Sequence, residues 1–194
     1  MTRVIVCGLG RTGYTIFSLL KQQGVPVIGL STTPVQFPLE DPREVLVGNL
    51  RSADLLLMAG VREAQTLVLV TNDDALNLAI LTQARVLNPK IRIVNRLFNA
   101  NLGDRLDQTL PDHVSMSVAS LSAPIFTFAA LGNRAIGHLR LTDQTWPIHE
   151  ELIDDQHPWL GRSHSGLWDN KGRMQFNYLP TNGGKDLVSS ELEN

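Results

Sequence analysis

Three glycines near the start of the chain, Gly8, Gly10 and Gly13, have the G-x-G-x-x-G spacing of a phosphate-binding turn. They follow the apolar run Val4–Cys7 and precede a stretch whose apolar residues have helical spacing. In that setting the first glycine permits a tight turn, the second lets a phosphate approach the backbone, and the third lets helix and strand pack closely. The helix amides that follow then face the phosphate. The spacing predicts a nucleotide cradle, and the alternative is that the glycines serve the turn alone.

The position that should bind the ribose carries an unusual residue. A carboxylate normally ends the second strand of such a unit and accepts hydrogen bonds from the ribose hydroxyls. Here that position is Ser31, and the acidic pair Glu40 and Asp41 comes too late in the chain. The Ser31 side chain has one oxygen, so it cannot bind the two hydroxyls of a ribose diol with two acceptor oxygens as a carboxylate does. No arginine follows closely to bind a 2′-phosphate. The identity of the nucleotide stays open, including weak or absent dinucleotide binding.

Three further loops come at the expected ends of strands, where ligands of open α/β sheets bind. Their polar and glycine-rich residues are Gly48, Asn49 and Leu50 in the first loop, Thr71, Asn72, Asp73 and Asp74 in the second, and Arg96 in the third. Capping of the next helix explains Asp73 or Asp74 equally well. Arg96 also has an alternative role, because it can pair with a surface carboxylate.

Apolar runs that begin 20 to 24 residues apart indicate the elements that position these loops. They cover residues 4–7, 25–30, 45–47, 67–70, 91–94 and 114–116. Continuous rather than alternating apolar residues are typical of strands buried on both faces, and each gap has room for a crossover helix. We expect helices over residues 12–23, 51–59, 73–87 and 121–131. The pattern predicts an α/β protein with a Rossmann-like, doubly wound parallel sheet.

The sequence changes character near residue 135. Residues 1–135 carry 12 Lys/Arg and 10 Asp/Glu, whereas residues 136–194 carry 5 and 9. We therefore expect a nucleotide-binding domain over residues 1–135 and a small α+β module over residues 136–194. Strands are predicted at residues 138–142 and 173–179, the second after a hairpin turn at residues 169–172. Pro147 and later prolines and glycines break the rest into short pieces.

The whole-chain totals argue against several classes of protein. A net charge of −2 over 194 residues, with no basic stripe, disfavours nucleic-acid binding. The single cysteine, Cys7, can form no internal disulfide, which is typical of a reducing, intracellular setting. Asp154, Asp155, His157 and His164 match no strong metal-ligand spacing, so no metal site is predicted.

Taken together, the segments VIVCGLGRTG, VGNLRSADLLLMAG, VLVTNDDALNLAI and NPKIRIVNR resemble the RCK (KTN, or TrkA-N) domain that regulates potassium channels and Trk-type transporters. The resemblance covers roughly residues 3–131, and the tail is faintly similar to the family's C-terminal module. It implies a cytoplasmic, non-enzymatic regulatory subunit or domain that acts on a membrane-embedded potassium channel or transporter. Its ligand would be NAD(H) or an adenine nucleotide, that is ATP, ADP or AMP.

The resemblance also implies roles for residues. The phosphates would be held by Gly8, Gly10, Arg11, Thr12 and Gly13. The ribose would lie by Ser31, and the adenine side would be lined by Asn49 and Leu50. The pocket would be closed by Thr71, Asn72, Asp73 and Arg96. The very apolar helix from Leu121 to Leu131 would join two subunits as a homodimer, with a higher ring left open. A NAD(P)-dependent oxidoreductase is the alternative, although no Tyr-x-x-x-Lys pair is present.

Overall fold

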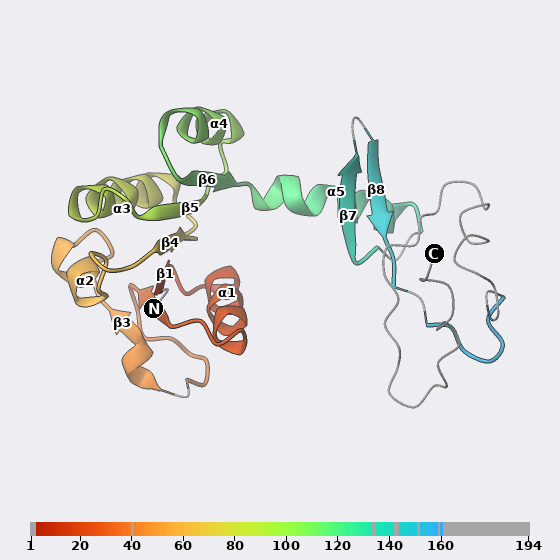
Figure 1. Cartoon of the computed structure of the whole chain (residues 1–194), viewed down its shortest axis with the longest axis horizontal. Helices are drawn as coiled ribbons and strands as arrows, with labels where there is room; N and C mark the ends of the chain where they lie inside the picture. Colours follow the sequence, from red (N-terminus) through yellow and green to blue (C-terminus); the bar gives the residue numbers. More distant parts are fainter. Residues whose placement is uncertain are drawn as a thin grey trace, which may run out of the picture.

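The computed structural model describes residues 3–39, 41–132, 135–141, 144–150, 152–158 and 160. Within these residues one parallel sheet is formed by β1 (Val4–Cys7), β2 (Val27–Ser31), β3 (Val45–Val47), β4 (Thr66–Leu69), β5 (Arg92–Arg96) and β6 (His113–Met116). The strand order is β3-β2-β1-β4-β5-β6 (Figure 1). This is the Rossmann order, which reverses between β1 and β4. The predicted doubly wound sheet is confirmed.

The sheet is covered on both faces. The described helices are α1 (Arg11–Gln22), the short 3-10 helix η1 (Pro42–Glu44), α2 (Ala53–Met58), α3 (Asp74–Leu87), α4 (Ala100–Thr109) and α5 (Val118–Ala130). Alternate residues of β1 belong to different cores: Val6 packs with Phe17 of α1, and Ile5 packs with Leu56 of α2 and Ile80 of α3. All four residues of β1 are buried, as the continuous apolar run predicted. This burial on both faces holds the β1–α1 turn rigidly in place.

Local signals explain where the helices begin and end. Helix α1 ends at Gln22, and Gly24 follows its cap with a φ of +71° and an amide that donates a hydrogen bond to the carbonyl of Lys21. Asp73 caps α3, because its carboxylate accepts hydrogen bonds from the amides of Ala75 and Leu76. Cys7 is fully buried, and burial raises the pKa of its thiol far above the ordinary value, so it stays protonated.

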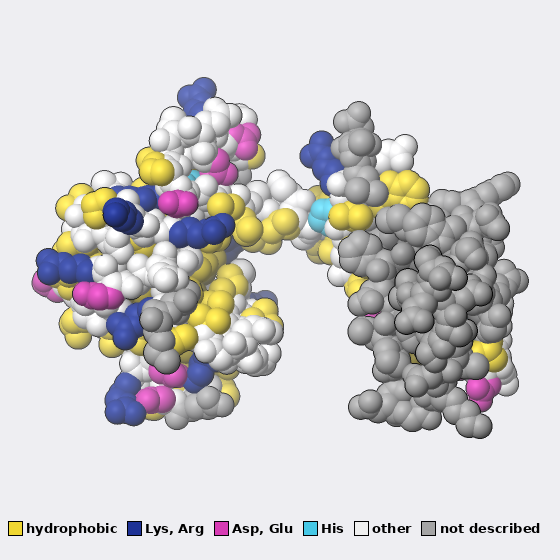
Figure 2. All heavy atoms as spheres, in the orientation of Figure 1, with side chains coloured by type: hydrophobic (Ala, Val, Ile, Leu, Met, Phe, Trp, Pro, Cys, Tyr) yellow, Lys and Arg dark blue, Asp and Glu magenta, His cyan; other side chains and the backbone are white. Residues whose placement is uncertain are grey.

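The α5 helix leads away from the sheet to an antiparallel hairpin, β7 (Gly137–Leu141) and β8 (Gln144–Ile148) (Figure 1). None of its residues is buried, so it is not a core helix of the single chain. Phe126 is 74% exposed, and hydrophobic side chains lie along the bridge that α5 forms between the two parts (Figure 2). No described helix is long and apolar enough to cross a membrane.

Two elements differ from the expectation. Helix α4 was not predicted, because its apolar residues are sparse; Asn99 begins it by accepting a hydrogen bond from the amide of Leu102. Pro147 does not break the chain but lies inside β8, in a two-stranded ribbon whose edges tolerate proline. The predicted strand at 138–142 is confirmed as β7. The strand at 173–179 and its turn at 169–172 lie outside the described residues.

Candidate functional site

The turn between β1 and α1 contains three glycines, Gly8, Gly10 and Gly13, which differ in backbone conformation and in the space around them. Gly8 has a φ of +97°, a conformation that favours glycine. A Cβ atom on Gly13 would lie 2.0 Å from the carbonyl oxygen of Gly8, so only glycine lets α1 approach the strand this closely. A Cβ atom on Gly10 would meet nothing within 4 Å, which leaves open space above its backbone. Gly8 and Gly13 therefore have the turn and packing roles that the spacing predicted, and the approach of a phosphate to Gly10 stays a prediction.

The start of α1 offers free hydrogen-bond donors beside this open space. Gly10 caps the helix without a side-chain hydrogen bond, and the first intrahelical bond is donated by the amide of Tyr14 to the carbonyl of Gly10. The amides of Arg11, Thr12 and Gly13 have no acceptor within the helix. Together with the helix dipole they favour an anion at this end. The side chains of Arg11 and Thr12 are exposed.

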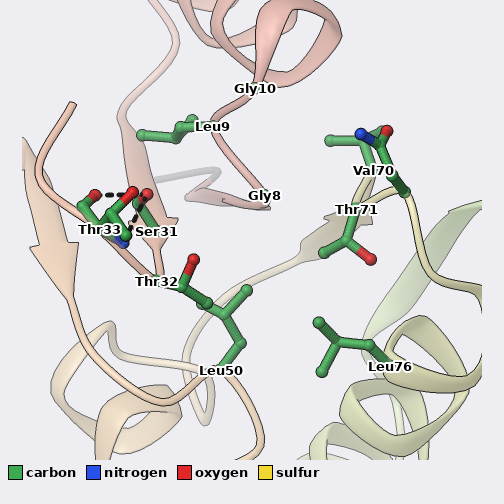
Figure 3. Close-up of a pocket in the computed structure, with 11 residues that line it drawn as sticks. Gly8, Leu9, Gly10, Ser31, Thr32, Thr33, Leu50, Val70, Thr71 and Leu76 are labelled. Carbon is green, nitrogen blue, oxygen red and sulfur yellow. Dashed lines mark hydrogen bonds between the residues drawn. The ribbon is translucent and has the colours of Figure 1, made fainter. Parts of the chain in front are cut away.

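A cavity of about 270 Å³ opens beside the turn at the carboxyl ends of β1, β2 and β4 (Figure 3). Its lining consists of Gly8, Leu9, Gly10, Ser31, Thr32, Thr33, Leu50, Val70, Thr71, Asn72 and Leu76. None of these residues carries an ionisable side chain. The cavity lies where the strand order reverses, the usual ligand position in an open α/β sheet. Its walls combine apolar side chains with hydroxyl and amide groups, as binding sites for small molecules commonly do.

A buried asparagine fixes the β4 end of the cavity. The Oδ1 atom of Asn77 accepts hydrogen bonds from the Thr71 hydroxyl at 2.7 Å and from the Thr71 amide at 3.3 Å. Its Nδ2 atom donates to the carbonyl oxygen of Arg96 at 2.9 Å. Asn77 is fully buried. Its hydrogen bonds to Thr71 and Arg96 join the loops that follow β4 and β5. Asn77 was not among the predicted site residues, although it lies one turn into α3.

The loop residues beyond Thr71 are held by one another. The Arg96 guanidinium donates to the Asn72 side chain at 2.8 Å and lies 4.7 Å from the centre of the Phe98 ring. Asp73 caps α3, and the Asp74 carboxylate accepts hydrogen bonds from the amides of Phe98 and Asn99. Capping and loop bracing therefore account for both carboxylates. Arg96 contacts an asparagine and an aromatic ring, and no carboxylate of the described residues lies within 4.0 Å of its guanidinium.

Residues at the end of β2 form the wall of the cavity opposite the loop after β4 (Figure 3). The Ser31 hydroxyl donates to the carbonyl of Thr33 at 2.7 Å, and Thr32 follows it into the cavity lining (Figure 3). Leu50 is 2% exposed and lines the cavity from the loop after β3. Its neighbour Asn49 is not part of the lining; the Asn49 side chain accepts a hydrogen bond from the amide of Arg51.

The structure thus brings together half of the predicted site residues. Those in the cavity lining are Gly8, Gly10, Ser31, Leu50, Thr71 and Asn72, and those outside it are Arg11, Thr12, Gly13, Asn49, Asp73 and Arg96. The lining also contains Leu9, Thr32, Thr33, Val70 and Leu76, which sequence analysis did not select. Thr32 and Thr33 directly follow the predicted ribose position, so their place in the sequence was the available signal.

This combination of sheet order, glycine turn and cavity defines a Rossmann-type domain with a candidate ligand site at the point where the strand order reverses. The chain belongs to the TrkA-N domain family, the RCK N-terminal domain, whose model matches residues 4–117. The resemblance inferred from the four segments is confirmed. No curated protein matches the chain.

Solved structures give the same assignment. The chain is 26% identical to the Kef CTD of Shewanella denitrificans in an AMP-bound form, with a TM-score of 0.56, and the match covers 68% of this chain and 83% of that one. GsuK bound to ADP is 27% identical, with a TM-score of 0.58 and coverages of 66% and 33%. The GsuK channel bound to NAD is 26% identical, with a TM-score of 0.58 and coverages of 66% and 23%. The chain spans a third or less of these two GsuK chains.

Proposed function

We propose that this chain is a nucleotide-sensing regulatory domain that controls a potassium channel or transporter. Its ligand is an adenine nucleotide, AMP, ADP or ATP, or NAD(H). The observation that carries the proposal is the glycine turn, which opens onto a cavity beside the free amides of α1. The AMP, ADP and NAD complexes of the similar Kef and GsuK structures support the same ligand class.

Each element of the site contacts a different part of the nucleotide. The phosphates lie against Gly8, Gly10 and the first turn of α1, that is Arg11, Thr12 and Gly13. The ribose lies near Ser31, and the adenine lies towards Asn49 and Leu50. Thr71, Asn72, Asp73 and Arg96 close the site from β4 and β5. In this arrangement Asn49, Asp73 and Arg96 act mainly by holding their loops, as their hydrogen bonds indicate.

Sensing requires that ligand binding favours one arrangement of the molecule over another. We propose that two chains pair through α5, the exposed apolar helix, and that the nucleotide shifts the geometry of the pair. The domain then comprises residues 1–135, and residues 136–194 form a small C-terminal module. A membrane-embedded potassium channel or transporter reads the shift, which places the domain on the cytoplasmic side.

Catalysis is disfavoured by the chemistry of the cavity. A nicotinamide-dependent oxidoreductase needs an acid or base positioned near the reacting carbon. The described residues that line the cavity carry no titratable side chain. His113 is buried on β6, and its Nδ1 atom lies 2.6 Å from the Asp107 carboxylate, away from the lining. A binding role therefore fits the site better than an oxidoreductase.

A thermal-shift titration with AMP, ADP, ATP, NAD⁺, NADH and NADP⁺ tests the proposal, with adenosine as the matched ligand that lacks a phosphate. At a hundredfold excess over Kd, binding adds about 2.7 kcal/mol of stability. For a chain of this size that raises Tm by roughly 5–10 °C. We expect such a rise with at least one phosphorylated ligand, little with adenosine, and no consumption of NAD(P)H. No rise with any nucleotide at millimolar concentration would contradict sensing, and steady turnover would favour the oxidoreductase.

A further inference from the structure

The hydroxyl of Ser31 is already used by the chain itself. Ser31 ends β2 at the position where a ribose-binding Rossmann site has a carboxylate. Its side chain donates to the carbonyl of Thr33 at 2.7 Å and accepts from the amide of Thr33 at 3.3 Å (Figure 3). The residue is only 7% exposed. The donor proton and one of the two acceptor lone pairs of the hydroxyl therefore close a turn, which leaves a ligand hydroxyl only one lone pair of a nearly buried oxygen.

Other described groups do not replace the missing carboxylate. The cavity lining contains no acidic residue. In the loop after β2, the Asp41 carboxylate accepts three hydrogen bonds from the Arg43 side chain, and Glu44 forms an ion pair with Lys21. Neither residue belongs to the lining. The ribose side of the cavity therefore offers threonine hydroxyls and apolar groups instead of a fixed anionic acceptor.

This difference has a definite consequence for ligand selection. A site built to hydrogen-bond a ligand hydroxyl rejects the analogue that lacks it by about 10⁴-fold, because buried polar groups are then left without a partner. A site with no dedicated partner loses little when the hydroxyl is removed. Binding free energy must then come mainly from the phosphate at the α1 N-terminus and from the base.

We propose that this site, given the proposed nucleotide-binding function, binds adenine nucleotides without reading the ribose 2′-hydroxyl. The ligand class is thus wider than ribonucleotides, and 2′-deoxy nucleotides compete at the same cavity. Ser31 is the residue that determines this tolerance. A carboxylate in its place restores the discrimination that the fold normally has.

Isothermal titration of the full chain with AMP and 2′-deoxy-AMP tests the proposal without any substitution. We expect the two dissociation constants to agree within fivefold. A preference for AMP of more than fivefold overturns the proposal while leaving nucleotide sensing intact. Absence of binding by every nucleotide in the thermal-shift panel overturns both, so the two failures are distinguishable.

The Ser31→Asp variant supplies the reciprocal test. An ionised aspartate cannot donate to the Thr33 carbonyl, but it can accept from the Thr33 amide through one oxygen and present the other to the ribose. We expect a preference for AMP over 2′-deoxy-AMP of at least tenfold in this variant. A folded variant that still binds both ligands equally would show that the ribose does not lie against β2, and Ser31 would not be the determinant. The wild-type comparison decides the proposal if the variant does not fold.

Discussion

At the residue scale, the turn between β1 and α1 depends on glycines. Substitutions at two of them, Gly13 and Gly10, distinguish an effect on stability from an effect on ligand binding. Gly13 is in contact with the backbone of Gly8, whereas Gly10 faces open space. We predict that Gly13→Ala lowers the free energy of unfolding by about 1–3 kcal/mol, because the added Cβ atom forces α1 away from the strand. Urea unfolding measures this loss.

Gly10→Ala is the matched substitution. Its φ of −72° suits alanine, so stability falls by less than about 1 kcal/mol, the usual cost at a helix cap. The new methyl group occupies the space that a phosphate needs, and we predict at least tenfold weaker binding of AMP by calorimetry. Unchanged AMP affinity in a folded Gly10→Ala variant would show that the phosphate lies elsewhere.

Asn77 carries a second prediction at this scale. Removing its side chain leaves the Thr71 amide and hydroxyl and the Arg96 carbonyl without their buried partner. We expect Asn77→Ala to lose roughly 2–4 kcal/mol of stability in chemical denaturation. Thr82→Ala on the same helix is the control, since its exposed hydroxyl bonds only to Leu78 within the helix. Equal losses in the two variants would mean that Asn77 does not brace the loops.

At the element scale, α4 is tied to β6 by one carboxylate. Asp107 accepts hydrogen bonds from the Ser115 amide at 2.8 Å and lies 2.6 Å from Nδ1 of His113. Partial burial raises the pKa of Asp107, but the hydrogen bonds from Ser115 and His113 outweigh it and hold the pKa below its ordinary value. The ionised form is therefore favoured in the folded state.

A depressed carboxyl pKa contributes stability above the unfolded-state value, about 3.9, and loses it as pH falls through the folded value. We predict that Asp107→Ala costs about 1–2 kcal/mol at pH 7, from the lost hydrogen bonds. This difference from wild type should shrink as the pH falls below about 4. Asp104→Ala, which removes an exposed carboxylate from the same helix, is the control. A constant difference from pH 7 to pH 3 would contradict the assignment.

The elements also show what sequence patterns can predict. Apolar runs located all six strands of the sheet to within a few residues. Burial on both faces gives this local signal in β1, β2 and β4, whereas the edge strands β3 and β6 are only partly buried. Helix α4 is polar and partly exposed, and its few apolar residues, Leu102 and Leu106 at helical spacing, together with the Asn99 cap, were the available signals. The hydrogen bonds of Ser31 and Asn77 depend on the folded loops. Residue types at strand ends therefore predicted where the candidate site lies, but they did not predict the hydrogen-bond partner of each side chain.

At the scale of the whole molecule, α5 presents apolar surface that a single chain leaves in water. Phe126 of α5 is 74% exposed, and Leu131, which directly follows the helix, is 73% exposed. An exposed apolar helix of this kind favours association. We predict a dimer at micromolar concentration by light scattering, and a monomer for Phe126→Asp with nucleotide affinity retained.

The matched control is Val86→Asp on α3, where the side chain is 72% exposed and lies outside the proposed contact. This variant should remain dimeric, because it removes a similarly exposed apolar group from another helix. A strictly monomeric wild-type chain, or equal dissociation in the two variants, would remove α5 as the contact.

The central claim is that a nucleotide phosphate binds at the glycine turn. Amide chemical shifts of the isotopically labelled full chain, followed during titration with AMP, test it most directly. We expect saturable changes for Gly8, Gly10 and the first turn of α1, with smaller changes at Thr71 and Asn72. Saturable changes confined to other parts of the chain, or none at millimolar AMP, ADP and NAD⁺, would contradict it.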